Sequence, residues 1–424
     1  MESLLSTSQD NLIGGLDFSI SSNTASYVED RSESSWMASS NYFSPTGVRT
    51  IRVNIAGNTF CDLSSLILVG ILHNDDGANT LQPLTCGLHG LISRFTCYVS
   101  GSKAEDILHY NRTTEMFMRM MPEDVRRNMA AASGFGVTTA GTPAGNDFLP
   151  NSVAPNGQLR FTHKPILSGI CNCGKYMPLQ FLGAGGVILE FELDSALVGI
   201  STAAGTSSTW HISDIRAQAA TINVNSSLLE AYSAHILSSK SLLIPYKTFT
   251  CTSSALPDSN DHDSSIARNF TRLCTLFQTF STTDNANGTA KEVNTFYNPA
   301  NATSSDEFSS ILQIGNKRWA EFDKTGVAQH YHYLLNALGY SNSLVSSANI
   351  NVGAYSSDSF IAATDTEKVP QATMSGYNTS GGQQITASWK NMGNATANRC
   401  KKTFFCAHYD CVLELASTSA QVHQ

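Results

Sequence analysis

Charged residues are scarce in this chain. Lysine, arginine, aspartate and glutamate make up only 14% of its 424 residues, well below the roughly 25% that is usual for soluble domains. The 26 basic and 34 acidic residues give a net charge of −8, and no block of basic residues occurs. An acidic chain without such blocks is a poor candidate for binding nucleic acid through its phosphates. The polar surface must therefore consist mainly of hydroxyls and amides.

A long hydrophobic run is also missing. The longest one, residues 66–72 (LILVGIL), falls far short of the about 20 residues that a membrane span needs. The first residues lack the basic stretch and apolar core of a secretory signal. We therefore expect a protein that is cytosolic or nuclear at synthesis and has no transmembrane segment. In such a chain the ten cysteines are expected to be reduced and buried.

Catalytic and cofactor motifs are absent as well. The sequence contains no G-x-S-x-G, H-E-x-x-H, Walker A or EF-hand pattern. The glycine-rich segment 183–186 precedes an expected strand, whereas a phosphate loop joins a strand to a helix. We expect turn glycines there. The sequence thus predicts no catalytic, cofactor-binding or metal-binding residues, no cofactor and no enzyme activity.

The most metal-like cluster lies near the C-terminus, where Cys400, Cys406, His408 and Cys411 fall within twelve residues. If residues 403–415 form a strand, Cys406 and His408 face one way and Cys411 the other, because side chains alternate along a strand. These residues cannot complete a tetrahedral zinc site without a bend. We therefore interpret the cluster as structural.

Three weaker clusters receive equally plain interpretations. A pair of cysteines beside a glycine is read as part of a loop, and an acidic group with one histidine as a solvated turn. Two histidines that are two residues apart on an expected helix point about 200° apart around its axis, so they form no paired site. The residues concerned are Cys171 and Cys173; Asp258, Asp261, His262 and Asp263; and His330 and His332.

What the sequence does contain is the alternation of β-strands. Apolar and polar residues alternate over 51–55 and 187–193, and again at Ile385, Ala387 and Trp389, as half-buried strands require. Helices are few; the periodicity predicts them at 105–121, 226–239 and 326–338. Long loops rich in small polar residues separate the elements at 130–157, 252–265, 282–306 and 341–382. Many short strands with few helices indicate jelly rolls or sandwiches.

The order of elements repeats once. The segment 95–120 is expected to run strand, Gly-Ser-Lys and helix, and the segment 311–339 strand, Gly-Asn-Lys and helix. A strongly alternating strand follows each of them later. This order predicts two similar halves joined near residues 225–240. Residues 1–45 hold thirteen serines and a single basic residue, Arg31, and are expected to be a flexible arm.

This ordered combination resembles the double jelly-roll major capsid proteins of tailless icosahedral DNA viruses, of the Polinton-like virus and virophage type. The resemblance spans about residues 48–415 and lies in four segments. These are 60–101, with strands that lead toward a helix; 164–193, with Pro178-Leu179 before an alternating strand; 211–245, with a strand and linker helix; and 375–416, with Tyr409-Asp410 in the closing strands.

The resemblance implies an all-β chain of two tandem eight-stranded antiparallel jelly rolls with a few short helices and long loops. It divides the chain into an arm (1–45), a first roll (46–225), a linker helix (226–240) and a second roll (241–424). It implies a capsid protein of the virion that self-assembles as homotrimeric, pseudo-hexagonal capsomers. Penton and minor capsid proteins are the other partners it implies. The basic arm of capsid proteins that bind genome is missing, so specific nucleic-acid binding is not expected.

Two other functions stay open from the sequence alone. A spike, penton or fibre protein of a virus is a different structural role, and a single-roll version of it would not repeat the order of strand and helix. A jelly-roll carbohydrate-binding protein or cupin-like enzyme is the second alternative. A cupin needs clustered histidine and glutamate ligands on neighbouring strands, and we cannot assemble such a set.

Overall fold

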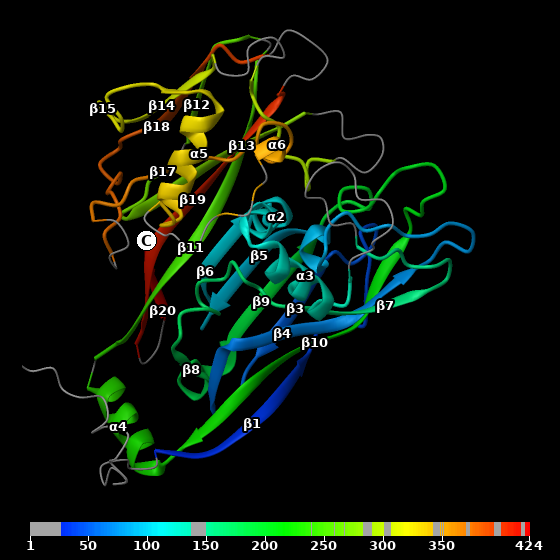
Figure 1. Ribbon diagram of the computed structural model, residues 1–424. Helices are drawn as coiled ribbons and strands as arrows, with labels where there is room; N and C mark the ends of the chain where they lie inside the picture. Colours follow the sequence, from blue (N-terminus) through cyan, green and yellow to red (C-terminus); the bar gives the residue numbers. More distant parts are fainter. Residues whose placement is uncertain are drawn as a thin grey trace, which may run out of the picture.

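The chain forms two consecutive bodies of β-strands that lie side by side (Figure 1). The computed structural model describes residues 27–136, 150–238, 240–257, 259–266, 268–282, 291–300, 307–341, 348, 350, 352–369, 374–393, 400–416 and 420–424.

The first body, roll one, is an eight-stranded sandwich within the described residues. Its strands in chain order are β1 (Val28–Met37), β3 (Thr50–Ile55), β4 (Phe60–Asn74), β5 (Ile92–Val99), β6 (Ser102–Leu108), β7 (Gln158–His163), β9 (Val187–Leu193) and β10 (Trp210–Val224). The short strands β2 (Tyr42–Phe43) and β8 (Tyr176–Pro178) are added at the edges of the ladder. The helices are η2 (Leu88–Leu91), α2 (Tyr110–Met120), α3 (Glu123–Ala132), η3 (Leu179–Phe181) and η4 (Gly183–Gly185).

The second body, roll two, follows the linker helix α4 (Ser226–Leu237). Its main strands are β11 (Leu242–Ala255), β12 (His262–Ile266), β13 (Leu273–Ser281), β14 (Ser309–Ile314), β15 (Lys317–Arg318), β17 (Ala362–Asp365), β18 (Ile385–Lys390) and β19 (Lys402–Leu415). Two short strands, β16 (Lys324–Thr325) and β20 (Ala420–His423), extend the sheets, and the helices are α5 (Gly326–Ala337) and α6 (Val352–Tyr355).

Both rolls connect their strands in the same order. Roll one pairs β1-β10-β4-β7 in one sheet, sheet I, and β3-β9-β5-β6 in the other, sheet II. Roll two pairs β11-β19-β13-β17, sheet III, and β12-β18-β14-β15, sheet IV. Counted within each roll, the order is first-eighth-third-sixth and second-seventh-fourth-fifth, and all these pairs are antiparallel. This is the jelly-roll arrangement, so the predicted fold class and the repeat are confirmed.

The strands follow from the alternation that the sequence shows. Ile51, Val53 and Ile55 of β3 are fully buried in roll one and pair with β9. Ile385 and Trp389 of β18 are equally buried in roll two. Strand β4 lies in the middle of sheet I, between β10 and β7, and although it is apolar on both faces, only its inner face is fully buried.

The expectation of a flexible arm is wrong for part of residues 1–45. Residues 28–37 form β1, which pairs with β10 from Val28↔Val224 to Met37↔Arg216, so roll one begins before residue 46. Serines and charges suit this position, because an edge strand of a sheet exposes much of its length. Residues 1–26 lie outside the described residues.

The helix expected at 105–121 is also partly wrong. Residues 102–108 form β6, in a hairpin with β5 that turns at Ser100 (φ 49°) and Gly101 (φ 82°). The helix starts only at Tyr110. Pairing with β5 outweighs the helical spacing of the apolar residues, which is the usual limit of local patterns.

The other two expected helices are confirmed as α4 and α5. The expected loops are confirmed only in part, because helices and strands enter three of them. Helix α3 extends to Ala132 at the start of 130–157, β11 and β12 enter 252–265, and α6 and β17 lie within 341–382. Parts of three loops (137–149, 283–290, 301–306, 342–347, 349, 351 and 370–373), like residue 258 in the fourth, lie outside the described residues.

Candidate functional site at the junction of the two rolls

Helix α2 of roll one lies between the two rolls (Figure 1). Every residue of this helix except Phe117 is buried, including three charged side chains, Arg112, Glu115 and Arg119. Charged side chains are rarely buried unless they are paired. Their partners therefore define how one roll is fixed to the other.

Arg112 donates its guanidinium hydrogens to roll two. It bonds the carbonyl oxygens of Glu292, of Thr295 at 2.7 Å and of Phe280 at 2.9 Å, and the hydroxyl of Thr279 at 3.2 Å. Four acceptors of one roll thus depend on one side chain of the other. Burial lowers the pKa of Arg112 to about 10, so the group remains charged at neutral pH.

Aromatic rings surround these polar contacts. The Arg112 guanidinium lies over the rings of Phe296 and Phe404, 4.4 and 4.3 Å from their centroids, a cation–π arrangement. Phe117 packs against Phe249 and Phe277 of sheet III, with ring centroids 5.0 and 5.3 Å away. The outer face of sheet III is therefore covered by α2.

Glu115 joins α2 to its own roll through a buried ionic network. Its carboxylate lies 2.9 Å from Arg126 of α3, 3.4 Å from Arg119 and 3.2 Å from His89. Burial opposes ionisation, but the Arg126 and Arg119 charges and the His89 hydrogen bond lower the pKa of Glu115 to about 2. Arg119 in turn donates to the hydroxyl of Ser359 in roll two at 2.8 Å.

A second contact joins β6 to β11. Tyr246 of β11 donates its hydroxyl to the carbonyl of Ala104 at 2.8 Å. Beside it, Glu105 of β6 is fully buried and accepts from the hydroxyl of Ser168 and the backbone N–H of Gly169. Burial raises the pKa of Glu105, while these hydrogen bonds oppose the shift. Gly169 leaves no room for a side chain, since a Cβ would lie 1.8 Å from the carbonyl oxygen of Lys247.

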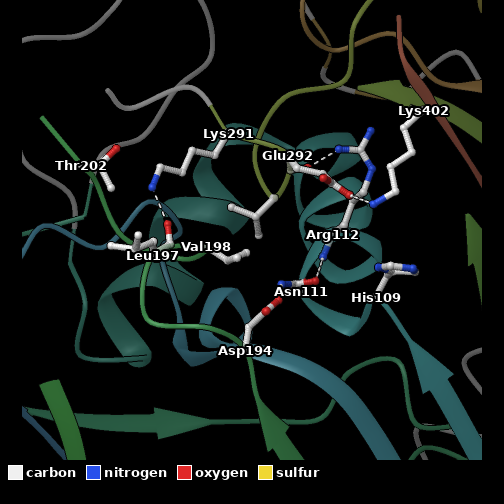
Figure 2. A pocket seen from close by; sticks show the side chains of 11 residues that line it. His109, Asn111, Arg112, Asp194, Leu197, Val198, Thr202, Lys291, Glu292 and Lys402 are labelled. Carbon is white, nitrogen blue, oxygen red and sulfur yellow. Dashed lines mark hydrogen bonds and ion pairs between the residues drawn. The ribbon is translucent and has the colours of Figure 1, made fainter. Parts of the chain in front are cut away.

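A cavity of about 350 Å³ lies at the edge of this junction (Figure 2). Its charged side chains have partners within the chain: Lys402 lies 2.7 Å from Glu292, and Asn111 donates to Asp194 at 2.9 Å. Lys291 bonds the carbonyl of Leu197 on the other roll. Of these three links, the Lys291–Leu197 hydrogen bond joins the two rolls, whereas Lys402–Glu292 lies within roll two and Asn111–Asp194 within roll one.

The metal-like cluster near the C-terminus is dispersed across β19. Cys406 and His408 lie on the same face of sheet III, where Cys406 is opposite Cys251 and His408 is opposite Phe249 on β11. His408 stacks on Phe249 at 4.5 Å, and burial lowers its pKa to about 3. Cys411 lies opposite Tyr246. In the part of the chain that the structure describes, no group of three or more His, Cys, Asp and Glu residues could hold a metal ion.

The other singled-out residues are also separated. His330 is buried between Phe308 and Trp389, and burial lowers its pKa to about 4. Its Nδ1 donates to the carbonyl of Gly326 at 2.7 Å, so its Nε2 accepts from the hydroxyl of Ser310 at 2.8 Å. His332 is exposed on α5. The interpretation of the acidic group as a solvated turn is wrong for two of its residues, because His262 and Asp263 begin β12, where His262 is buried and Asp263 exposed. Asp261 is exposed just before this strand, and Asp258 lies outside the described residues.

The glycines and cysteines have structural positions. Gly183–Gly185 form the short helix η4 before β9. All ten cysteines are free; nine are buried, including Cys171, and Cys173 is half-buried. Burial raises the pKa of their thiols, as for Cys251, where it reaches about 11. The predicted burial is confirmed for nine of the ten cysteines.

The sequence analysis missed the residues that hold the junction. Arg112, Glu115 and Arg119 follow one another at spacings of three and four, which places them on one side of a helix. Such a charged stripe ordinarily indicates a solvated face. Nothing local reveals that roll two covers it.

Strand order and junction together define the class: the chain is a double jelly roll. Its fold is that of the major capsid proteins of double jelly-roll viruses. No protein-family model and no curated protein sequence matches the chain.

Similar solved structures come from several viruses. VP54 of PBCV-1, fitted into a reconstruction of the virophage Sputnik, has a TM-score of 0.60 and 13% identity, over 94% of this chain and 97% of that chain. The Faustovirus major capsid protein has a TM-score of 0.58 and 8% identity, over 95% and 93%. The mavirus major capsid protein has a TM-score of 0.50 and 9% identity, over 96% and 94%.

None of the helices in the described residues has the length and apolar character that crossing a membrane requires.

Proposed function

We propose that this chain is a major capsid protein of a tailless icosahedral virus of the Polinton-like or virophage type. The observation that carries the proposal is the presence, in one chain, of two rolls with identical strand order held by a buried junction. Three copies of such a chain would present six near-equivalent rolls, which fill a hexagonal outline. Closed cyclic symmetry is the usual form of such self-assembly.

The proposed assembly has two levels. Homotrimers form first, and contacts between trimers then tile the shell, with penton and minor capsid proteins as further partners. The protein is synthesised in the host cell and resides in the virion. Its role is structural rather than enzymatic, and the acidic chain encloses the genome without specific nucleic-acid binding.

The long loops and the N-terminal segment are assigned by analogy. Residues in 130–157, 282–306 and 341–382 contribute trimer contacts and the outer surface. The N-terminal residues before β1 reach neighbouring subunits or minor proteins. Hydroxyl and amide groups suit such interfaces, because they can pair without the desolvation cost of charges.

The size and shape of the purified full chain test the proposal. Native mass spectrometry should give three times the mass of one chain, and electron microscopy should show hexagonal particles or shells. A monomer at micromolar concentration would contradict it. Elongated trimers with a distal head would favour a spike or fibre instead, and monomers retained on a glycan array would favour a carbohydrate-binding protein.

A further inference from the structure

Sheet I has an outer face that corresponds, strand for strand, to the face of sheet III that α2 covers. In sheet III the covered row runs from Cys251 of β11 to Cys406 of β19 and Phe277 of β13. In sheet I the equivalent row runs from Met37 of β1 to Arg216 of β10 and Val69 of β4. The two sheets are therefore equivalent surfaces in different surroundings.

The outer face of sheet I is open. Met37 is 66% exposed, and Val69 and Ile71 of β4 are half-buried although β4 is a central strand. A cleft of about 350 Å³ lies along this row, lined also by Arg160 and Arg216. This face combines partly exposed apolar side chains with arginines and other polar groups, and methionine and arginine are enriched in protein–protein interfaces.

Roll two carries the elements that are equivalent to β6 and α2, and they too are open. The hairpin β14–β15 corresponds to β5–β6, and helix α5 corresponds to α2. Of the twelve residues of α5 only Gly326, His330 and Leu334 are buried. Phe322, in the loop between the hairpin and α5, is 52% exposed.

The two open surfaces carry opposite charges. The edge strand β1 exposes Glu29, Asp30 and Glu33, with Arg31 as its one cation. The strand β15 consists of Lys317 and Arg318, and both are exposed. Complementary charges orient two partners and fix their register. In the row of Met37, Arg216 and Val69 the Arg216 charge already has a partner, since its guanidinium lies 2.5 Å from Asp214.

We infer that the edge β1 and the outer face of sheet I of one copy receive the β14–β15 hairpin, Phe322 and α5 of a second copy. The contact repeats, between chains, the one that β6 and α2 make with sheet III within the chain. Lys317 and Arg318 pair with the acidic residues of β1, and Phe322 lies on the row of Met37, Val69 and Ile71. The contact is head-to-tail, so it generates a ring when its rotation closes; closure with three copies rests on the proposed function.

Charge reversal on the full chain tests this interface. Glu29→Lys with Glu33→Lys makes β1 basic, and Lys317→Glu with Arg318→Glu makes β15 acidic. Each double variant should weaken the trimer on the order of 100-fold, because like charges then face each other. All four substitutions in one chain restore opposite charges and should recover most of the trimer. The matched control is Asp263→Lys, an exposed carboxylate on the opposite edge strand β12, which should leave the trimer intact.

Native mass spectrometry and analytical ultracentrifugation over a concentration series measure the outcome, with circular dichroism to verify folding. A trimer unchanged by both double variants would overturn this interface while leaving the proposed capsid function in place. The pairing of β15 with β1 would also be overturned if both double variants are folded but dissociated and the fourfold variant does not recover trimers. A wild-type chain that is monomeric at high concentration would instead contradict the proposed function itself.

Discussion

Sheets I and III share a strand order but have outer faces of different chemistry. Sheet III presents Phe249, Phe277 and Phe404, all covered by α2 of the other roll. The equivalent face of sheet I presents aliphatic Val69 and Ile71, flanked by arginines. A face covered from the moment of folding can be aromatic, whereas a face exposed before assembly must stay soluble. The difference is consistent with a permanent contact on sheet III and with the proposed contact between copies on sheet I.

Helices α2 and α5 differ in the same sense. Arg112 and Arg119 of α2 are buried with partners in roll two, while α5 buries three of twelve residues. Losing a partner of a buried charge is costly, so α2 is committed to its position. Helix α5 has no such commitment, so it can contact a second copy as proposed.

Removing the Arg112 side chain should have the largest effect. The substitution Arg112→Met leaves four buried acceptors of roll two without their donor, and the free energy of unfolding should fall by about 3 kcal/mol or more. Urea denaturation of the purified chain measures this. On α5 the control His332→Met, at an exposed position, should change stability by less than about 0.5 kcal/mol. Equal effects of the two substitutions would remove the distinction between the helices.

Acid should lower the contribution of α2 to the folding stability of the chain. The folded pKa of Glu115 is about 2, below its ordinary value of 4.5, so its contribution is complete above pH 4.5 and disappears as the pH falls toward 2. The contribution amounts to about 3 kcal/mol. Glu115→Gln should lower stability at pH 7 and flatten the decline between pH 5 and 2 in thermal or urea unfolding. Glu321→Gln, at an exposed residue before α5, should leave the pH profile of stability unchanged. If Glu115→Gln loses stability between pH 5 and 2 as steeply as the wild type does, Glu115 is not the group responsible.

Two phenylalanines sharpen the comparison. Phe117→Ala should lower the stability of the chain by about 2 kcal/mol, because the ring packs on the covered face of sheet III. Phe322→Ala removes a ring that is 52% exposed and should leave unfolding nearly unchanged while it weakens self-association. Thermal unfolding and sedimentation, measured on both variants, separate the two effects. If Phe322→Ala lowered stability and Phe117→Ala weakened only self-association, the distinction between the covered face of sheet III and the open face of sheet I would be contradicted.

Thiol labelling is the mildest probe of the covered face. In the native chain, iodoacetamide should modify the half-buried Cys173 first, while Cys251 and Cys406 beneath α2 stay unreactive. In Arg112→Met both should become labelled, because α2 is loosened. Peptide mass spectrometry identifies the modified residues. Labelling of Cys251 in the wild type at the rate of Cys173 would show that α2 does not protect this face.

The sequence was a good guide to repetitive local structure and a poor one to its exceptions. Alternation at 187–193 predicted β9, and the helical pattern at 226–239 predicted α4. The serine-rich residues 28–37 gave no strand signal, because an edge strand with exposed side chains lacks alternation. Residues 105–108 were predicted to be helical, because their apolar spacing fits a helix, but they belong to β6.

The sequence by itself determined the fold class, because alternation, turn glycines and a repeated order of elements are local properties that survive without long-range contacts. It also determined the scarcity of charge, and thereby a surface made of hydroxyls and amides. Only the tertiary structure decided the fate of the few charges that remain. Arg112, Glu115 and Arg119 form a polar stripe in the sequence, yet Arg112 and Arg119 are buried with partners in roll two, and Glu115 is buried with His89 and Arg126 of its own roll. The burial of the two arginines depends on residues more than 150 positions away, and no local pattern encodes that distance.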